Sequence, residues 1–425
     1  MDIRIIMTIT LFVIVYVIIS MDLINKAYIA LFGASLLLVL KILPLETAFR
    51  KIDLNVISLL ISMMILVNIV KNTGVFQYVA IKSAKMVKGD PLKILVLLMV
   101  ITAGFSAFLD NVTTILILSP LSILIATELR ISPIPFLITQ AIASNIGGTA
   151  TLIGDPPNIM IAYGAGLTFN DFLINLTPLI LVIIVVAVFV TAVLFKKKLE
   201  VPPELQSRIM EFDESKSIPD RLFLFESLAV LSLVIMGFLL HDFIKLDTAV
   251  IAIFGATILL ITTRSKPDEV FSGVEWTTIF FFAGLFIMVG ALEELKIIEF
   301  LAKKITALSG DNLSIATFTT IWGSGILSGF IDNIPFVATM IPLIKILNLS
   351  FEPSTGNVLW WSLSAGACLG GNLTLIGASA NVVSAGIASK SGFSVSFIEF
   401  TKYGIIYTLI SLVITTLYIY LRYLM

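Results

Sequence analysis

Residues that soluble enzymes use for catalysis and metal binding are scarce in this sequence. It has one cysteine, Cys368, and one histidine, His241, so a single chain can form neither an internal disulfide bond nor a multi-thiolate metal site. Only 13% of the 425 residues are charged, and no P-loop pattern occurs. We therefore expect no enzymatic activity, no cofactor and no nucleic-acid partner, and ATP-driven transport by this chain alone is disfavoured.

Long apolar runs dominate the chain instead, and 58% of its residues are hydrophobic. Examples are Ile6–Ser20, Leu54–Val70, Phe172–Phe195 and Phe223–Leu240. Such lengths match the ~30 Å of hydrocarbon that a transmembrane helix crosses. The first run has no strongly basic n-region and no small-x-small cleavage site, so we interpret it as a retained helix. The composition predicts an all-α polytopic protein whose partner is the lipid bilayer of the plasma membrane.

The sequence is also duplicated internally. Residues 29–39 (IALFGASLLLV) match 251–261 (IAIFGATILLI), and 108–120 (FLDNVTTILILSP) match 330–342 (FIDNIPFVATMIP), both at a spacing of 222. GGTATLIGDPPN (147–158) and GGNLTLIGASAN (370–381) share seven of twelve positions at a spacing of 223. Three matches in the same order at nearly constant spacing indicate a repeated unit.

Each unit divides into apolar segments of helical length. The first has segments at 3–20, 25–41, 53–71, 74–88, 92–126, 134–162 and 172–196, and the second at 223–241, 247–263, 275–292, 312–347, 356–386 and 396–424. We interpret 92–126 as a re-entrant hairpin of two half-helices with Asp110 and Asn111 near its tip. Each unit then crosses the membrane an odd number of times, which predicts two inverted repeats with about 10 transmembrane helices, two re-entrant hairpins and two broken helices.

The basic residues predict an orientation for this arrangement. Seventeen of the 27 lysines and arginines, Lys26 among them, fall on the side that carries the polar linker between the units. The richer side is expected to be cytoplasmic, which places both termini on the extracytoplasmic side. The linker region 196–220 holds 11 charged residues and three prolines, and we interpret it as a solvated tether.

The two duplicated Gly-rich motifs interrupt helices at membrane depth. A broken helix exposes N–H groups that suit an anion and carbonyl groups that suit a hard cation such as Na⁺. Glycines let the backbone turn and let a ligand approach, while threonine and asparagine add side-chain oxygens. We therefore expect an ion and substrate site at these breaks. Simple close packing of glycine-containing helices is the alternative.

Three aspartates, Asp110, Asp155 and Asp332, stand in apolar surroundings. An ionisable group at membrane depth indicates function, and a carboxylate there can bind Na⁺ or carry a proton. Capping of the following half-helix is an alternative for Asp110 and Asp332, and it is compatible with ion binding. Asp155 corresponds to Ala378 in the second unit, which favours the first unit for the main cation or proton site. A possible Na⁺ site would use Asp110, Asn111, Asp155 and Asn158.

The segments FLDNVTT, SNIGGTATLIGDPPNIMIA, FIDNIPF and GGNLTLIGASANVV resemble the ion transporter superfamily. The resemblance is to its branch of arsenite permeases, NhaD-type Na⁺/H⁺ antiporters and P protein, and more distantly to CitM-like divalent-anion transporters. It implies elevator-type alternating access by a homodimer. It also implies a division into a first repeat at 1–198 (scaffold 1–90, transport elements 91–198), a cytoplasmic linker at 199–220 and a second repeat at 221–425 (scaffold 221–311, transport elements 312–425).

Carried over by position, the resemblance implies two clusters of binding residues. The first comprises Asp110, Asn111, Thr149, Thr151, Gly154, Asp155 and Asn158, and the second comprises Asp332, Asn333, Asn372, Thr374, Gly377 and Asn381. Carboxylate transporters of the superfamily carry Ser-Asn-Thr motifs at the hairpin tips, whereas the tips here read Asp-Asn-Val and Asp-Asn-Ile. This departure argues against dicarboxylate transport.

Together these patterns predict a secondary transporter of a small inorganic species or anion, such as arsenite or a carboxylate, coupled to H⁺ or Na⁺. The absence of lysine and arginine from the four motif segments argues against a highly charged anion held by a basic cluster. A Na⁺/H⁺ antiporter is the main alternative. A channel is disfavoured because two broken full-length helices fit a carrier better.

Overall fold

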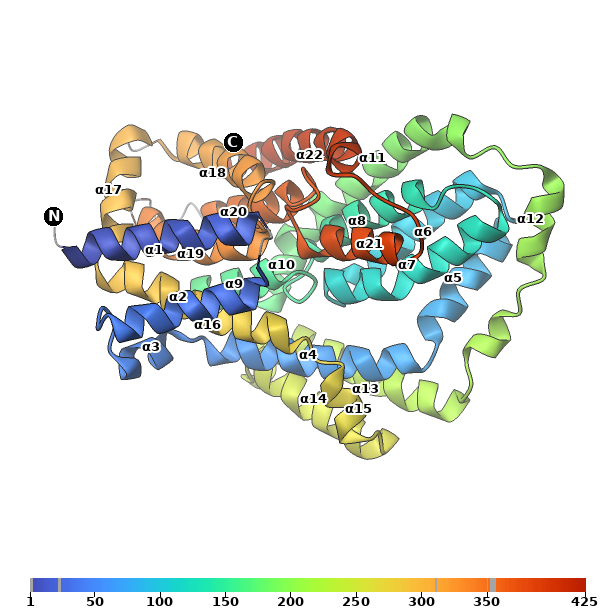
Figure 1. Ribbon diagram of the computed structural model, residues 1–425, viewed down its shortest axis with the longest axis horizontal. Coiled ribbons are helices and arrows are strands. Elements are labelled where there is room, and N and C mark those ends of the chain that lie inside the picture. Colours follow the sequence, from blue (N-terminus) through green and yellow to red (C-terminus); the bar gives the residue numbers. More distant parts are fainter. Residues whose placement is uncertain (1–2, 22–23, 310–311, 350, 352–356) are drawn as a thin grey trace.

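The computed structural model describes residues 3–21, 24–309, 312–349, 351 and 357–425, and throughout them the only regular structure is helical (Figure 1). Among these residues, seven helices are long and apolar enough to cross a membrane: α1 (Ile3–Ser20), α4 (Leu54–Asn72), α7 (Asn111–Glu128), α11 (Thr177–Phe195), α13 (Arg221–Ile244), α16 (Trp276–Glu294) and α22 (Phe397–Ile419). Shorter apolar helices are α2 (Lys26–Val39), α6 (Pro91–Ser106), α14 (Thr248–Thr263), α18 (Leu313–Ser328), α19 (Asn333–Asn348) and α20 (Val358–Gly370). The remaining α-helices are α3 (Leu45–Lys51), α5 (Val75–Met86), α8 (Ile134–Gly148), α9 (Pro156–Ala165), α10 (Phe169–Asn175), α12 (Pro203–Met210), α15 (Pro267–Ser272), α17 (Ile297–Ser309) and α21 (Ser379–Lys390). The expected all-α polytopic membrane protein is confirmed.

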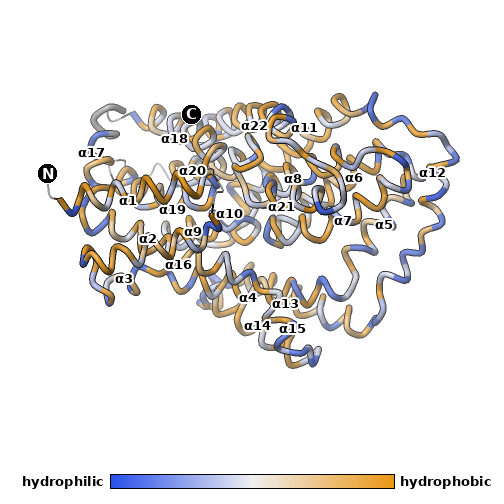
Figure 2. Tube along the Cα trace, viewed as in Figure 1, coloured by the Kyte–Doolittle hydropathy of each residue, from blue (hydrophilic) through white to orange (hydrophobic). Residues whose placement is uncertain are grey.

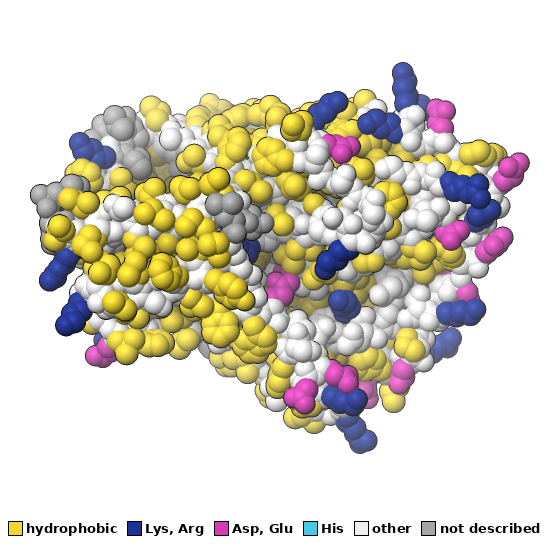
Figure 3. All heavy atoms as spheres, in the orientation of Figure 1, with side chains coloured by type: hydrophobic (Ala, Val, Ile, Leu, Met, Phe, Trp, Pro, Cys, Tyr) yellow, Lys and Arg dark blue, Asp and Glu magenta, His cyan; other side chains and the backbone are white. Residues whose placement is uncertain are grey.

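Hydropathy follows this helical arrangement. The apolar helices form a bundle in which hydrophobic stretches predominate, and hydrophilic stretches gather around α12 and the segments beside it (Figure 2). In the space-filling view, hydrophobic side chains cover much of the left and upper face, while charged side chains gather at the right-hand end and at the lower edge (Figure 3). Exposed apolar side chains on α1, α11 and α13 are those that a lipid-facing surface requires.

The two halves of the chain interlock through their early helices. Helix α2 of the first half packs against α16 of the second, and α14 of the second half packs against α4 of the first. Gly284 of α16 makes one of these approaches close, because a Cβ atom added there would lie 2.7 Å from the carbonyl carbon of Ala30 in α2. These two contacts are equivalent under the duplication, because α2 corresponds to α14 and α4 corresponds to α16.

Two helical hairpins, α6–α7 and α18–α19, carry the Asp-Asn pairs between their arms. The Asp110 side chain accepts a hydrogen bond from the Thr113 amide at 2.8 Å, and the Asp332 side chain accepts one from the Ile334 amide at 3.1 Å. The capping interpretation is therefore confirmed for both aspartates. The arms agree with the predicted segments 92–126 and 312–347, because α7 has 18 residues and the other three have 16 each. A helix of 16 residues extends about 24 Å.

Both Gly-rich motifs break their helices. The chain leaves helical conformation between α8 and α9 and again between α20 and α21. Gly147 allows α8 to approach α6, because a Cβ atom there would lie 2.1 Å from the Ala103 carbonyl oxygen. Pro156 occupies the first position of α9, where the missing amide hydrogen has no consequence for helix hydrogen bonding.

The linker between the halves is mostly exposed, as a solvated tether would be, but it is not a free tether because parts of it pack against the protein. Helix α12 contacts α5 and α7, and the 3-10 turn at Glu214–Ser217 (η2) contacts α5. Ile209 is fully buried, and the Lys85 ammonium donates hydrogen bonds to Glu214 at 2.6 Å and to the Phe212 carbonyl at 2.9 Å. This ammonium holds the pKa of the Glu214 carboxyl below its usual range. The mostly polar composition of the linker did not predict the burial of its apolar side chain or the ion pair.

Candidate functional site

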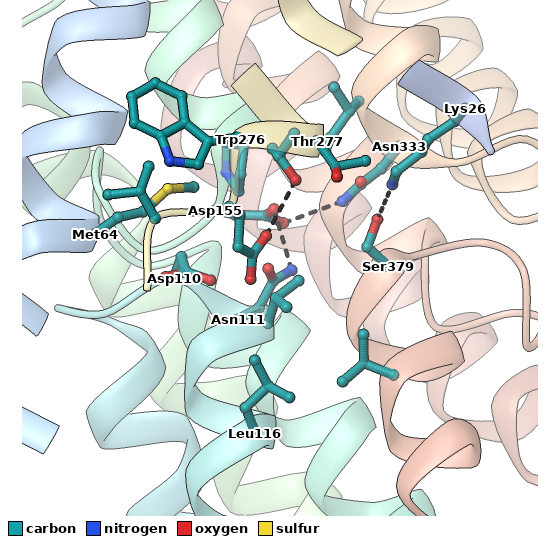
Figure 4. Close-up of a pocket in the computed structure, with 17 residues that line it drawn as sticks. Lys26, Met64, Asp110, Asn111, Leu116, Asp155, Trp276, Thr277, Asn333 and Ser379 are labelled. Carbon is teal, nitrogen blue, oxygen red and sulfur yellow. Dashed lines mark hydrogen bonds between the residues drawn. The ribbon is translucent and has the colours of Figure 1, made fainter. Parts of the chain in front are cut away.

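A cavity of about 470 Å³ lies where both hairpin turns, both helix breaks and the second-half segment before α16 meet (Figure 4). Its charged lining residues are Lys26, Asp110, Asp155 and Glu275. Its polar neutral lining residues are Asn111, Asn333, Thr277, Thr278 and Ser379. Elements far apart in the sequence thus place carboxylates, amides and hydroxyls around one space.

Asp155 is the point at which the two hairpins converge. Its side chain is fully buried, directly before α9. The Asn111 side-chain amide donates to its Oδ1 at 3.2 Å, and the Asn333 side-chain amide donates to its Oδ2 at 3.2 Å. These two contacts are visible in Figure 4. Within the described residues, no lysine or arginine forms an ion pair with this carboxylate, so no fixed cationic side chain neutralises it at the cavity.

A chain of asparagines extends from this carboxylate across the two halves. Asn111 also donates to the Asn145 side-chain oxygen at 3.0 Å. Asn145 in turn donates to the side-chain oxygens of Asn372 at 2.9 Å and Asn381 at 3.0 Å. All four side chains are buried. Asn145 was missed in the sequence, because it precedes the Gly-rich motif and corresponds to Cys368 in the second unit.

Asn158 and Asn381 hold their own loops together. The Asn158 amide donates to the Thr151 carbonyl at 2.8 Å, and the Asn381 amide donates to the Gly371 carbonyl at 2.8 Å. Their side-chain oxygens accept from the opposite half, since Ser364 donates to Asn158 at 2.6 Å. Neither asparagine lines the cavity. Of the four residues proposed for Na⁺, the structure therefore brings Asp110, Asn111 and Asp155 to the cavity and leaves Asn158 behind the loop.

The predicted threonines bond to backbone rather than line the cavity. The Thr149 hydroxyl donates to the Asn145 carbonyl at 2.7 Å, the Thr151 hydroxyl to the Ala107 carbonyl, and the Thr374 hydroxyl to the Gly329 carbonyl at 2.5 Å. The last two bonds tie each broken segment to the hairpin of its own half.

Gly154 and Gly377 permit the same close approach of loop and hairpin. A Cβ atom at Gly154 would lie 2.5 Å from the Ser106 carbonyl oxygen, and one at Gly377 would lie 2.9 Å from the Gly329 carbonyl oxygen. The Gly377 carbonyl also accepts a hydrogen bond from the backbone amide of Asn333 at 3.2 Å. These glycines shape the site without contributing side chains to it.

Lys26 is a lining residue that the sequence analysis counted only among the basic residues of the linker side. Its ammonium lines the cavity and lies 3.0 Å from Oδ2 of Asp332 and 2.5 Å from Oγ of Ser379. Lys26 is the first residue of α2, three residues before the start of the duplicated IALFG segment. The apolar run was taken to begin one residue earlier, at a presumed interface, so nothing in the pattern placed this charge beside the hairpin.

Glu275 is a second lining residue that the sequence analysis missed. It stands before α16, and the Thr278 hydroxyl donates to its carboxylate at 3.0 Å. Its counterpart 222 residues earlier is Asp53, which caps α4 by accepting from the Asn55 amide at 3.0 Å. Glu275 makes no such cap and lines the cavity instead. An acidic residue occupies this position in both copies of the duplication, and that repetition could have identified Glu275 as a candidate site residue.

The charge balance of the cavity favours a cation. Three carboxylates line it against one ammonium, and that ammonium is already paired with a fourth carboxylate, Asp332. A multiply charged anion entering alone would meet repulsion from carboxylates that lie in a poorly screened interior. A monovalent cation or a proton would be attracted by the same groups.

Comparison with known proteins places this arrangement among transporters. Residues 15–366 match the family described as citrate transporter (CitMHS). The chain is 44% identical over 424 residues to a 46 kDa membrane protein of Mycobacterium leprae, covering 99% of both chains. It is 43% identical to an uncharacterized transporter of Mycobacterium tuberculosis, covering 98% of both. It is 34% identical to the human P protein over 92% of this chain and 56% of that protein.

Proposed function

Because this chain belongs to the citrate transporter (CitMHS) family and is a secondary transporter, we propose that it moves a small inorganic species or anion coupled to H⁺ or Na⁺. The observation that carries the proposal is the Asp155 carboxylate. It is fully buried, it accepts amide hydrogen bonds from both hairpins, and it faces a cavity. A buried carboxylate without a fixed cationic partner is suited to bind Na⁺ or to carry a proton.

The coupling site in this proposal comprises Asp110, Asn111, Asp155 and Asn333. The two carboxylates supply charge, and the two amides supply oxygen or N–H groups according to the state of Asp155. Because Asn111 and Asn333 come from different hairpins, a cation or proton at Asp155 changes the contacts of both at once. Occupancy of the site is thereby linked to the position of both hairpins.

We further propose that the halves are inverted repeats that operate by an elevator-type movement. The scaffold would comprise residues 1–90 and 221–311, and the transport elements would comprise 91–198 and 312–425. The exchange of partners between the halves, with α2 on α16 and α14 on α4, supports a scaffold built from both repeats. In this arrangement the 199–220 linker is cytoplasmic, both termini are extracytoplasmic, and the protein assembles as a homodimer.

The solute in this proposal is small and weakly charged. Arsenite at neutral pH is largely an uncharged trihydroxide, for which amide and hydroxyl groups such as Asn333 and Thr277 are suitable partners. A carboxylate such as citrate would need co-bound cations, because the acidic groups of the cavity outnumber its single lysine. This charge balance is also the observation that favours the second candidate function, a Na⁺/H⁺ antiporter without another solute.

Transport by the purified protein in proteoliposomes tests these functions. We expect saturable uptake of arsenite or a carboxylate that requires a Na⁺ or pH gradient and shows counterflow. Collapse of a pH gradient by Na⁺ alone would favour the antiporter, and non-saturable flux without counterflow would indicate a channel. Loss of the coupled flux in Asp155→Asn, with normal membrane insertion, is expected for either carrier.

A further inference from the structure

The ion pair between Lys26 and Asp332 connects α2 to the polar elements of the second half. The ammonium contacts Asp332 and Ser379 together, and the Ser379 hydroxyl donates to the same Asp332 oxygen at 2.9 Å. Asp332 precedes α19 and Ser379 begins α21, so one side chain from an early helix binds a hairpin and a helix break at once. The contact joins residues 306 positions apart.

This contact lies beside open space rather than inside a closed core. A second cavity of about 200 Å³ is lined by Asn25, Lys26, Thr277, Asp332 and Ser379 among others. The Lys26 and Asp332 side chains are 25% and 12% exposed. An ion that enters this cavity can therefore reach the Asp332 carboxylate without unfolding of the surrounding helices.

The duplication gives only one of the two hairpin aspartates such a partner. Asp110 corresponds to Asp332, and Thr248 corresponds to Lys26 at the same spacing of 222. Thr248 carries no charge and shares a hydrogen bond of 2.9 Å with the hydroxyl of Tyr163 in α9. Among the described residues, the second hairpin aspartate thus has a lysine as ion-pair partner and the first hairpin aspartate has none.

We propose that Asp332 and Ser379 form a second monovalent-cation site and that the Lys26 ammonium occupies this site in competition with Na⁺. This inference rests on the proposed function, because it assigns a coupling role to a neighbour of the same cavity. The ammonium and Na⁺ carry the same charge and would use the same oxygens, so electrostatic repulsion makes their binding mutually exclusive.

The pseudo-symmetry of the two halves suggests in which state of the transporter Na⁺ replaces the Lys26 ammonium at Asp332. If the halves exchange conformations between the two states of the transporter, Lys26 moves into surroundings like those of Thr248, beside the end of α21 rather than at Asp332. Withdrawal of the ammonium would then leave Asp332 free for Na⁺. One positive charge would accompany the hairpin in both states, which avoids an uncompensated carboxylate during the movement.

Equilibrium binding of ²²Na⁺ to the purified full-length protein tests the proposal. We expect Lys26→Met to gain high-affinity Na⁺ binding at a site that the unchanged protein fills only at high Na⁺ concentration, and Lys26→Met/Asp332→Asn to lose that binding again. Lys26→Arg keeps a cation and is expected to retain the original isotherm. Lys51→Met is the matched control, because Lys51 is also 25% exposed and pairs with Glu293 at 3.0 Å, away from Asp332.

A second measurement needs no substitution. If Na⁺ displaces the ammonium, labelling of Lys26 by an amine-reactive reagent should rise with NaCl and not with choline chloride, while labelling of Lys51 stays constant. An unchanged isotherm in Lys26→Met together with Na⁺-independent labelling would overturn the inference, as would a gained site that persists without Asp332. Coupled transport that is lost in Asp155→Asn would still support the proposed function in that case, so the two failures are distinguishable.

Discussion

Replacing Asp155 by asparagine is the most informative perturbation of the cavity. The substitution keeps the size of the side chain and removes its charge. One of the two amide donors, Asn111 or Asn333, would keep an oxygen acceptor, and the other would face an NH₂ group. The change therefore removes charge and one hydrogen bond while it creates no cavity.

The expected loss of cation binding is large. A contact of about 2.4 Å between a carboxylate oxygen and Na⁺ contributes roughly 7 kcal/mol at an effective dielectric constant of about 20. An amide oxygen in the same place retains only a dipole. If other ligands and water offset more than half of this term, about 2.7 kcal/mol remains, which corresponds to about a hundredfold loss of affinity.

The stability of the cation-free protein should change in the opposite direction. A buried carboxylate without a cation costs several kcal/mol in desolvation, and a hydrogen bond to a charged group returns about 1.5–3 kcal/mol. The Asp155→Asn variant would forgo one such bond but remove the buried charge. We therefore expect the melting temperature without Na⁺ to stay constant or rise, while the increase produced by added Na⁺ disappears.

Thermal unfolding with NaCl or choline chloride and flux in proteoliposomes measure these two effects on the same preparation. Asp247→Asn is the control, because Asp247 caps α14 outside the main cavity and asparagine caps equally well. Coupled flux within about threefold of the unchanged protein would refute the role of Asp155, because the lost charge predicts a far larger effect. A marked fall in melting temperature without Na⁺ would instead identify Asp155 as a structural residue.

Three further predictions concern packing, coupling and the linker. Gly147→Ala should destabilise the protein by about 3 kcal/mol or more, since the new methyl group meets α6 backbone at 2.1 Å, whereas Gly104→Ala, with nothing within 4 Å, should be neutral in thermal unfolding. Glu275→Gln should raise the apparent KM for the coupling cation about tenfold with little change in maximal flux, because one of the three lining carboxylates loses its charge. Lys85→Met should increase proteolysis of the linker. The unchanged protein should show the same increase at acid pH, because the Lys85–Glu214 contact is intact above the lowered pKa of the Glu214 carboxyl and is lost as the pH falls through it.

Much of the fold could be predicted because its signals are local. Apolar length identified the membrane character, and the helix breaks followed from glycines and prolines within a few residues of one another. The extent of the hairpin arms was also predicted, since α6 and α7 span 91–128 against the predicted 92–126. Pro120 and Pro342 lie inside α7 and α19, and both helices continue past them.

Within the site, the polar residues at the helix breaks could be found from the sequence. The sequence did not show which of them line the cavity and which bond to the loop backbone. Asp155 and Asn111 line the cavity, whereas Asn158 and Asn381 bond to their own loop carbonyls. Each residue type can serve either purpose. The choice depends on which backbone groups the break leaves without partners, and that is a property of the folded loop.

The sequence alone determined that this chain crosses a membrane, that it contains an internal duplication, and that each copy interrupts a helix with polar residues. These features depend on neighbouring residues and on their repetition along the chain. Only the tertiary structure decided that Lys26 meets Asp332 and that Glu275 faces the cavity. Those contacts arise when α2 packs on α16 and the hairpins approach the breaks of both halves. Charges that stand at the ends of apolar runs give no sign of such long-range partners, since the same pattern also suits a residue at the membrane surface.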